Sequence, residues 1–182
     1  MFKWLMFISS YLPLYVLVII INFPQITTLR FSTSPVSTYL FLLIILFFML
    51  ISIVVLFYIL FKKTNRTTPV GYYKKLDDNL ISYIMTYLIP LLSIDIYNIY
   101  SITVNIILFL MIGLIYTKND LVYLNPLFSL VGFYVYKTDA DIYIITKMKI
   151  TQLDNMREKG IEVGSLRLAN DVHLYKKKPN NN

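Results

Sequence analysis

The sequence predicts an all-α membrane fold: a four-helix transmembrane bundle with a small cytoplasmic α+β tail domain. The first observation is the stretch Val36–Phe61, which carries no charged side chain and exceeds the ~20 apolar residues that a spanning helix needs. The second is composition, since 57% of the residues are hydrophobic, only 15% are charged and the mean hydropathy is +0.64. Soluble chains carry about 25% charged residues. The 182 residues therefore suit one membrane unit and one small domain.

The expected transmembrane domain covers residues 1–118, with spans at about residues 4–23, 37–61, 79–96 and 99–116. We interpret the first span as a retained helix and not as a cleaved signal peptide. Its apolar stretch is long, and Asn22–Gln25 offers no small-residue cleavage site. The third span is the weakest, because it is short, contains Pro90 and ends near Asp95.

The distribution of basic residues orients these spans. The middle loop, Lys62–Asn79, holds five basic residues, whereas residues 24–36 hold only Arg30 and the turn Asp95–Ser101 holds none. Lys and Arg collect in cytoplasmic loops. We therefore expect a multi-pass protein of the bacterial cytoplasmic membrane, with the middle loop and both termini in the cytoplasm.

Proline and polar residues inside the spans predict local features. Pro13 and Pro90 should bend the first and third spans, and the carbonyl groups that they free need hydrogen-bond donors in lipid. Nearby hydroxyls can supply them: Ser9, Ser10, Ser82 and Thr86. We place Asp95 among the lipid headgroups, and we interpret Asn105 as an interhelical contact that holds a bundle or an oligomer together.

Residues 119–176 are expected to form the cytoplasmic α+β domain. Two aromatic and β-branched runs, Gly132–Lys137 and Ile142–Met148, flank a four-residue polar turn and predict a β-hairpin. The other expected elements are a connector at 121–131, a helix at 151–159 that stops at Gly160, strands at 162–168 and 171–175, and a disordered tail at 177–182. We expect the hairpin to offer unpaired edges to a cytosolic partner, or else to pack on its own helix or a neighbouring subunit.

The residue inventory predicts a protein that is not an enzyme and has no catalytic, cofactor-binding or metal-binding residues. The chain has no cysteine and a single histidine, His173, and its five glycines form no phosphate-binding loop. Asp139 and Asp141 fit turn chemistry better than a catalytic carboxylate pair. The basic face should attract anionic headgroups of the lipid bilayer, and we expect no direct contact with nucleic acid.

The chain resembles the KwaA family, the membrane subunit of the bacterial Kiwa antiphage defence system. The resemblance rests on the four-span layout with a cytoplasmic N-terminus and on three strings: Ser10–Tyr15, Tyr83–Ser93 and Leu124–Leu127. It implies a membrane sensor or scaffold that forms a homo-oligomer, a tetramer in this family, and acts with a cytosolic DNA-binding effector. Two other classes remain open: a bacteriocin-immunity-type membrane protein and a membrane-disrupting abortive-infection effector.

Overall fold

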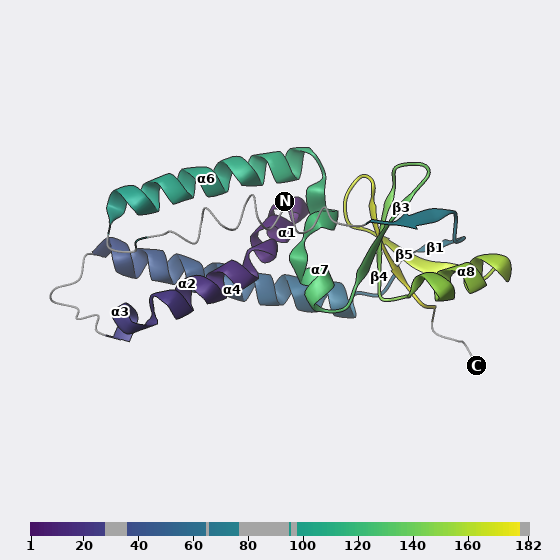
Figure 1. The fold of residues 1–182 in the computed structure, drawn as a ribbon, viewed down its shortest axis with the longest axis horizontal. Helices are drawn as coiled ribbons and strands as arrows, with labels where there is room; N and C mark the ends of the chain where they lie inside the picture. Colours follow the sequence, from purple (N-terminus) through teal and green to yellow (C-terminus); the bar gives the residue numbers. More distant parts are fainter. Residues whose placement is uncertain (28–35, 65, 77–94, 96–97, 179–182) are drawn as a thin grey trace.

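Long helices and a β-sheet meet end to end in the computed structural model (Figure 1). The structure describes residues 1–27, 36–64, 66–76, 95 and 98–178. Within this part, three helical segments are long and apolar enough to cross a membrane: Phe2–Ile21, Thr38–Phe61 and Ile99–Lys118. They match the first, second and fourth expected spans and fit a membrane protein. The third expected span, at 79–96, lies outside the described residues.

The first of these segments is divided into α1 (Phe2–Ser10) and α2 (Leu12–Ile21), and α3 (Phe23–Thr27) follows it. The second is α4 (Val36–Phe61) and the third is α6 (Ile99–Lys118). Figure 1 shows that α4 and α6 both run towards the sheet, whereas α1 begins beside it. The N-terminus and the sheet therefore lie at the same end of the helices.

The sheet has six strands in the order β1-β5-β6-β4-β3-β2. The strands are β1 (Arg66–Thr68), β2 (Tyr73–Lys75), β3 (Tyr134–Thr138), β4 (Tyr143–Thr146), β5 (Val163–Arg167) and β6 (Val172–Lys176). The pair β4–β6 is parallel, and the other pairs are antiparallel. Both edge strands come from the middle loop.

The sheet overturns the predicted fold class. The described residues combine helices with a six-stranded mixed sheet, so the protein is not an all-α four-helix transmembrane bundle with a small separate tail. The middle loop supplies β1 and β2, and the sheet thus draws on residues from both sides of the domain boundary expected at residue 118. Each of these strands has three residues, which is too short for a detectable hydrophobic periodicity. Each also pairs with a strand distant in sequence, so no hairpin pattern marks it.

The two faces of the sheet pack against different layers. On β4, Ile144 packs with Leu153 of α8 (Ile150–Glu158), whereas its neighbour Ile145 belongs to the core cluster that includes Met6 and Phe7 of α1. Successive strand residues point to opposite faces. The sheet is therefore held between α8 and the ends of the apolar helices.

Most local expectations for the tail are confirmed. The hairpin forms as β3 and β4, and β5, α8 and β6 match the expected strands and helix to within a few residues. The connector is a 3-10 turn, Leu121–Leu124, followed by α7 (Pro126–Leu130). Gly160 has φ +64° where α8 stops, a left-handed conformation that glycine adopts without steric cost.

Candidate functional site

Polar contacts join the ends of α1, α4 and α6 to the sheet and to the connector between α6 and β3, and we call this set of contacts the junction. Its first contact is made by Lys176, on the central strand β6. The Lys176 Nζ donates to the carbonyl oxygens of Ile59 at 2.8 Å, Leu60 at 2.8 Å and Lys62 at 2.7 Å. An ammonium group has three N–H donors, so all three are used on the end of α4.

This contact satisfies both partners electrostatically. The last carbonyl groups of a helix have no partner within the helix and form the negative end of its dipole. Burial lowers the pKa of Lys176, and the nearby Lys147 lowers it further. The carbonyl groups provide the stabilisation that holds this partly buried cation at the end of α4. They attach the helix directly to the middle of the sheet.

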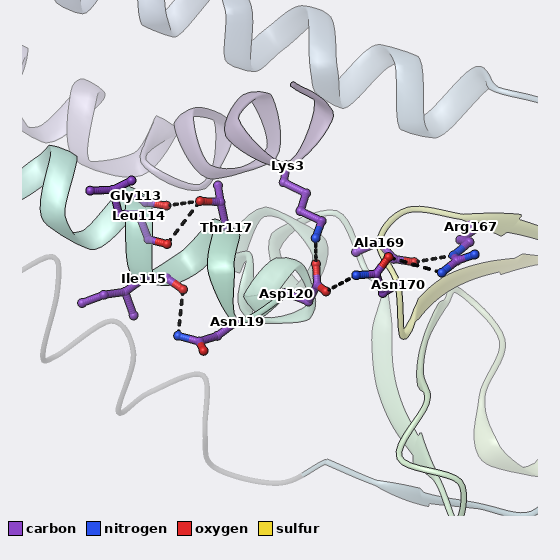
Figure 2. A network of polar contacts seen from close by, with 10 residues as sticks. All are labelled: Lys3, Gly113, Leu114, Ile115, Thr117, Asn119, Asp120, Arg167, Ala169 and Asn170. Atoms are coloured by element: carbon purple, nitrogen blue, oxygen red, sulfur yellow. Dashed lines mark hydrogen bonds and ion pairs between the residues drawn. The ribbon is translucent and has the colours of Figure 1, made fainter.

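Asp120 forms the second contact, which Figure 2 shows. Its carboxylate makes an ion pair with Lys3 of α1 and accepts a hydrogen bond of 2.9 Å from the Asn170 Nδ2. Arg167 donates to the Asn170 Oδ1 at 3.3 Å and to the Ala169 carbonyl at 3.1 Å. Asp120 follows α6 and has φ 54°, so one residue joins α1, the end of α6 and the turn between β5 and β6.

Asn125 makes the third contact and is almost fully buried. Its Nδ2 donates to the Met6 carbonyl at 3.1 Å and to the Ser9 Oγ at 3.0 Å. Its Oδ1 accepts from the Leu127 backbone N–H at 3.0 Å, which caps the start of α7. Pro126 occupies the first position of α7, where a missing N–H costs nothing. The connector is thereby fastened to α1.

The acceptors for Asn125 lie just before the break between α1 and α2. The bend expected at Pro13 is confirmed, since α1 ends at Ser10 and α2 begins at Leu12. Side-chain hydroxyls donate to the carbonyl groups before the break: Ser9 to Met6 at 2.8 Å, Ser10 to Phe7 at 2.6 Å, Tyr15 to Ile8 at 3.1 Å and Ser52 to Ile8 at 3.3 Å. Ser9 and Ser10 were expected as donors, whereas Tyr15 and Ser52 were not.

Close packing accompanies the polar contacts. A side chain at Gly113 of α6 would overlap the rings of Trp4 and Phe7, so α1 and α6 approach here as only glycine allows. Near the sheet, Tyr123 of the connector stacks on Tyr143 of β4, with ring centroids 3.6 Å apart and planes 4° apart. Burial raises the pKa of Tyr123 above the ordinary tyrosine value, and Tyr143 adds to this effect.

Three of the residues that the sequence singled out lie apart from the junction. His173 of β6 lies with its Nδ1 3.3 Å from the Ser165 Oγ, and burial, followed by the charge of Arg167, lowers its pKa. Asp141 has φ 58° in the hairpin turn and pairs with Lys137 at 2.7 Å. The Asn105 Nδ2 donates to the Ser101 carbonyl of its own helix at 2.9 Å; its role between helices stays a prediction.

The hairpin does not present free edges. Strand β3 pairs with β2 on one side, and β4 pairs with β6 on the other. The expectation that its edges receive a partner is therefore wrong. In the described ranges, no three His, Cys, Asp or Glu side chains come close enough to hold a metal ion. Of the three contacts of the junction, those of Lys176 and Asp120 join helix ends to the sheet, and that of Asn125 joins the connector to α1.

The residues that form the junction are visible in the sequence, but nothing in the sequence indicates that they make these contacts. Lys176 belongs to a run of three lysines that indicates a solvated tail, and Asp120 follows a helix end as many polar residues do. Only their contacts in the folded structure distinguish Lys176 and Asp120 from the polar residues beside them in the sequence.

Comparisons with known proteins give one family. A family model described as anti-phage protein KwaA matches residues 2–172. No curated protein and no solved structure matches the chain.

Proposed function

The chain belongs to the KwaA family of anti-phage proteins, and from this premise we propose that it is a non-enzymatic membrane sensor of phage infection. In this proposal the apolar helices lie in the bacterial cytoplasmic membrane and respond to its disturbance. The junction passes the displacement to the sheet, and a cytosolic DNA-binding effector responds to the sheet. Such an effector and a tetrameric homo-oligomer are what the family resemblance implies.

The direction of the helices supports the topology. Lys3 pairs with Asp120 at the sheet end, and α4 and α6 also end there. The N-terminus, the sheet and the basic middle loop then share one side of the membrane. The accumulation of Lys and Arg favours the cytoplasm for that side.

The observation that carries the proposal is the contact of Lys176 with the end of α4. The three hydrogen bonds of 2.7–2.8 Å go to carbonyl groups within about one turn at the end of α4, and they weaken when donor and acceptor separate. A shift of α4 along its axis must therefore move β6 or break these bonds. Because β6 pairs with both β5 and β4, either outcome reaches the middle of the sheet.

The test uses Lys176→Met, which keeps the apolar stem and removes the ammonium group. The matched control is Lys74→Met on the exposed edge strand β2. We expect Lys176→Met to insert in the membrane normally and to lose both phage protection and co-purification of the cytosolic effector. The control should retain both. Full protection by a correctly inserted Lys176→Met protein would contradict the proposal and favour a function confined to the apolar helices.

A further inference from the structure

A basic hollow of about 660 Å³ lies where α4 ends, between that helix end, β1 and the residues after β6. Six of its eleven lining residues are basic and none is acidic: Lys62, Lys63, Arg66, Lys176, Lys177 and Lys178. They come from two segments that are far apart in sequence, 62–66 and 176–178. Folding therefore concentrates positive charge beyond what the middle loop alone would carry.

Within the described part of the chain, no acidic residue neutralises the positive charge of the hollow. None of the ion pairs between described residues involves a basic residue of the hollow. Lys176 has used its three donors on the end of α4, but the other five basic side chains have donors to offer. Multiple Lys and Arg donors converging on one place are the usual means of binding a phosphate.

The hollow also has an apolar side. Leu60 and Phe61 line it, and the Phe61 ring stacks on Phe57 with centroids 5.9 Å apart. Phe57 and Phe61 are 55% and 75% exposed. An apolar strip therefore leads from the basic hollow along the surface of α4, away from the sheet.

We propose that the basic hollow binds the phosphate of an anionic phospholipid headgroup, with an acyl chain lying along Phe57 and Phe61. A ligand with an anionic head and an apolar tail matches both sides of the site. The inference requires that α4 crosses the membrane, but it does not depend on a sensing role. Once bound, the phosphate would join the end of α4, β1 and the residues after β6.

The experiment measures lipid binding to the purified full-length protein in detergent, by native mass spectrometry during titration with phosphatidylglycerol or phosphatidylcholine. The site variant is Lys63→Gln/Arg66→Gln/Lys178→Gln, which leaves Lys176 in place. The control variant, Lys74→Gln/Lys149→Gln/Lys159→Gln, removes the same charge from exposed positions outside the hollow.

We expect the wild-type and control proteins to prefer phosphatidylglycerol. The site variant should bind it at least roughly tenfold more weakly, since it lacks three basic side chains that attract an anionic headgroup. Equal losses in both variants would overturn the proposal in favour of diffuse surface attraction, and unchanged binding by the site variant would overturn it outright. If the site variant does not fold, as judged by circular dichroism, Arg66→Gln on the exposed edge strand is compared with Lys74→Gln.

Soluble sources of phosphate are tested in parallel. The protein is titrated with inorganic phosphate, ATP and a short DNA duplex in the absence of added lipid. Weak binding of all three, unaffected by the site variant, supports the lipid assignment. Tight binding of any of them that the site variant abolishes would overturn it and assign the hollow to that ligand.

Discussion

Asp120 joins three separate parts of the chain through one carboxylate. It pairs with Lys3 and accepts from Asn170, and its side chain is 17% exposed whereas that of Lys3 is 31% exposed. Partial exclusion of water strengthens such a pair relative to a fully solvated one. The chain offers a direct comparison, because Asp141 pairs with Lys137 in the hairpin turn and is 83% exposed.

A double-mutant cycle separates these two pairs. Lys3→Met and Asp120→Ala, made singly and together, should give a coupling energy of about 1 kcal/mol in the free energy of unfolding in micelles. The matched cycle with Lys137→Met and Asp141→Ala should give no measurable coupling. A null result for Lys3 and Asp120 would mean that their proximity does not stabilise the junction.

His173 gives the sheet an acid sensitivity of known sign. Burial lowers its pKa below the ordinary 6.5, Arg167 and Arg66 lower it further, and Asp171 opposes them. The unfolded chain therefore takes up a proton at a higher pH than the folded chain does. Stability should fall as the pH drops from about 7.5 to 5.5, through the range where histidine titrates. The full stability is present only above about pH 7.5, where His173 is neutral in both the folded and the unfolded chain.

The variant His173→Asn tests this expectation, since His173 is the only histidine. Unfolding temperatures measured in nanodiscs should depend less on pH in the variant than in the wild type over this range. An unchanged pH dependence would assign the acid sensitivity to other groups.

The approach of α1 to α6 depends on Gly113. Its missing side chain makes room for Trp4 and Phe7, and Phe7 is fully buried among aromatic rings that include Tyr11, Phe109 and Tyr116. Adding one methyl group forces these elements apart, at a cost of about 1–3 kcal/mol.

Gly113→Ala should therefore lower the unfolding temperature and shift the emission of Trp4, the only tryptophan in the chain. Gly71→Ala is the control, because a Cβ at Gly71 would meet nothing within 4 Å. Equal effects of the two substitutions would show that the helix contact tolerates a larger residue.

Elements with a local signal were predictable, and long-range pairings were not. Alternating aromatic and β-branched residues around Thr138–Asp141 indicate the hairpin, and uninterrupted apolar runs indicate α4 and α6. The strand β1 pairs with β5 about a hundred residues further along, in the register Arg66 to Ser165. Three-residue strands have no periodicity of their own, so the middle loop was interpreted only by its charge. The same holds for Lys176, whose acceptors lie on a distant helix.

The N-terminus, the sheet and the basic residues that the structure describes lie at one end of the apolar helices. This arrangement has a direct consequence for membrane topology. Reporter fusions at Lys74 and after Asn182 should report the cytoplasm. A fusion at Asn98, which caps the start of α6 at the opposite end, should report the exterior. A cytoplasmic signal at Asn98 would contradict a membrane-spanning α6.

Coupling of helices and sheet through the junction is tested most directly by hydrogen–deuterium exchange of the full-length protein in nanodiscs. Lys176→Met is compared with the wild type and with Lys74→Met. Loss of charge-assisted hydrogen bonds worth about 1.5–3 kcal/mol should raise exchange roughly tenfold or more. We expect this rise both in the last turn of α4 and in β6 and β4, with no change in Lys74→Met. A rise confined to α4, with the sheet unchanged, would show that helices and sheet move independently and would contradict transmission through the junction.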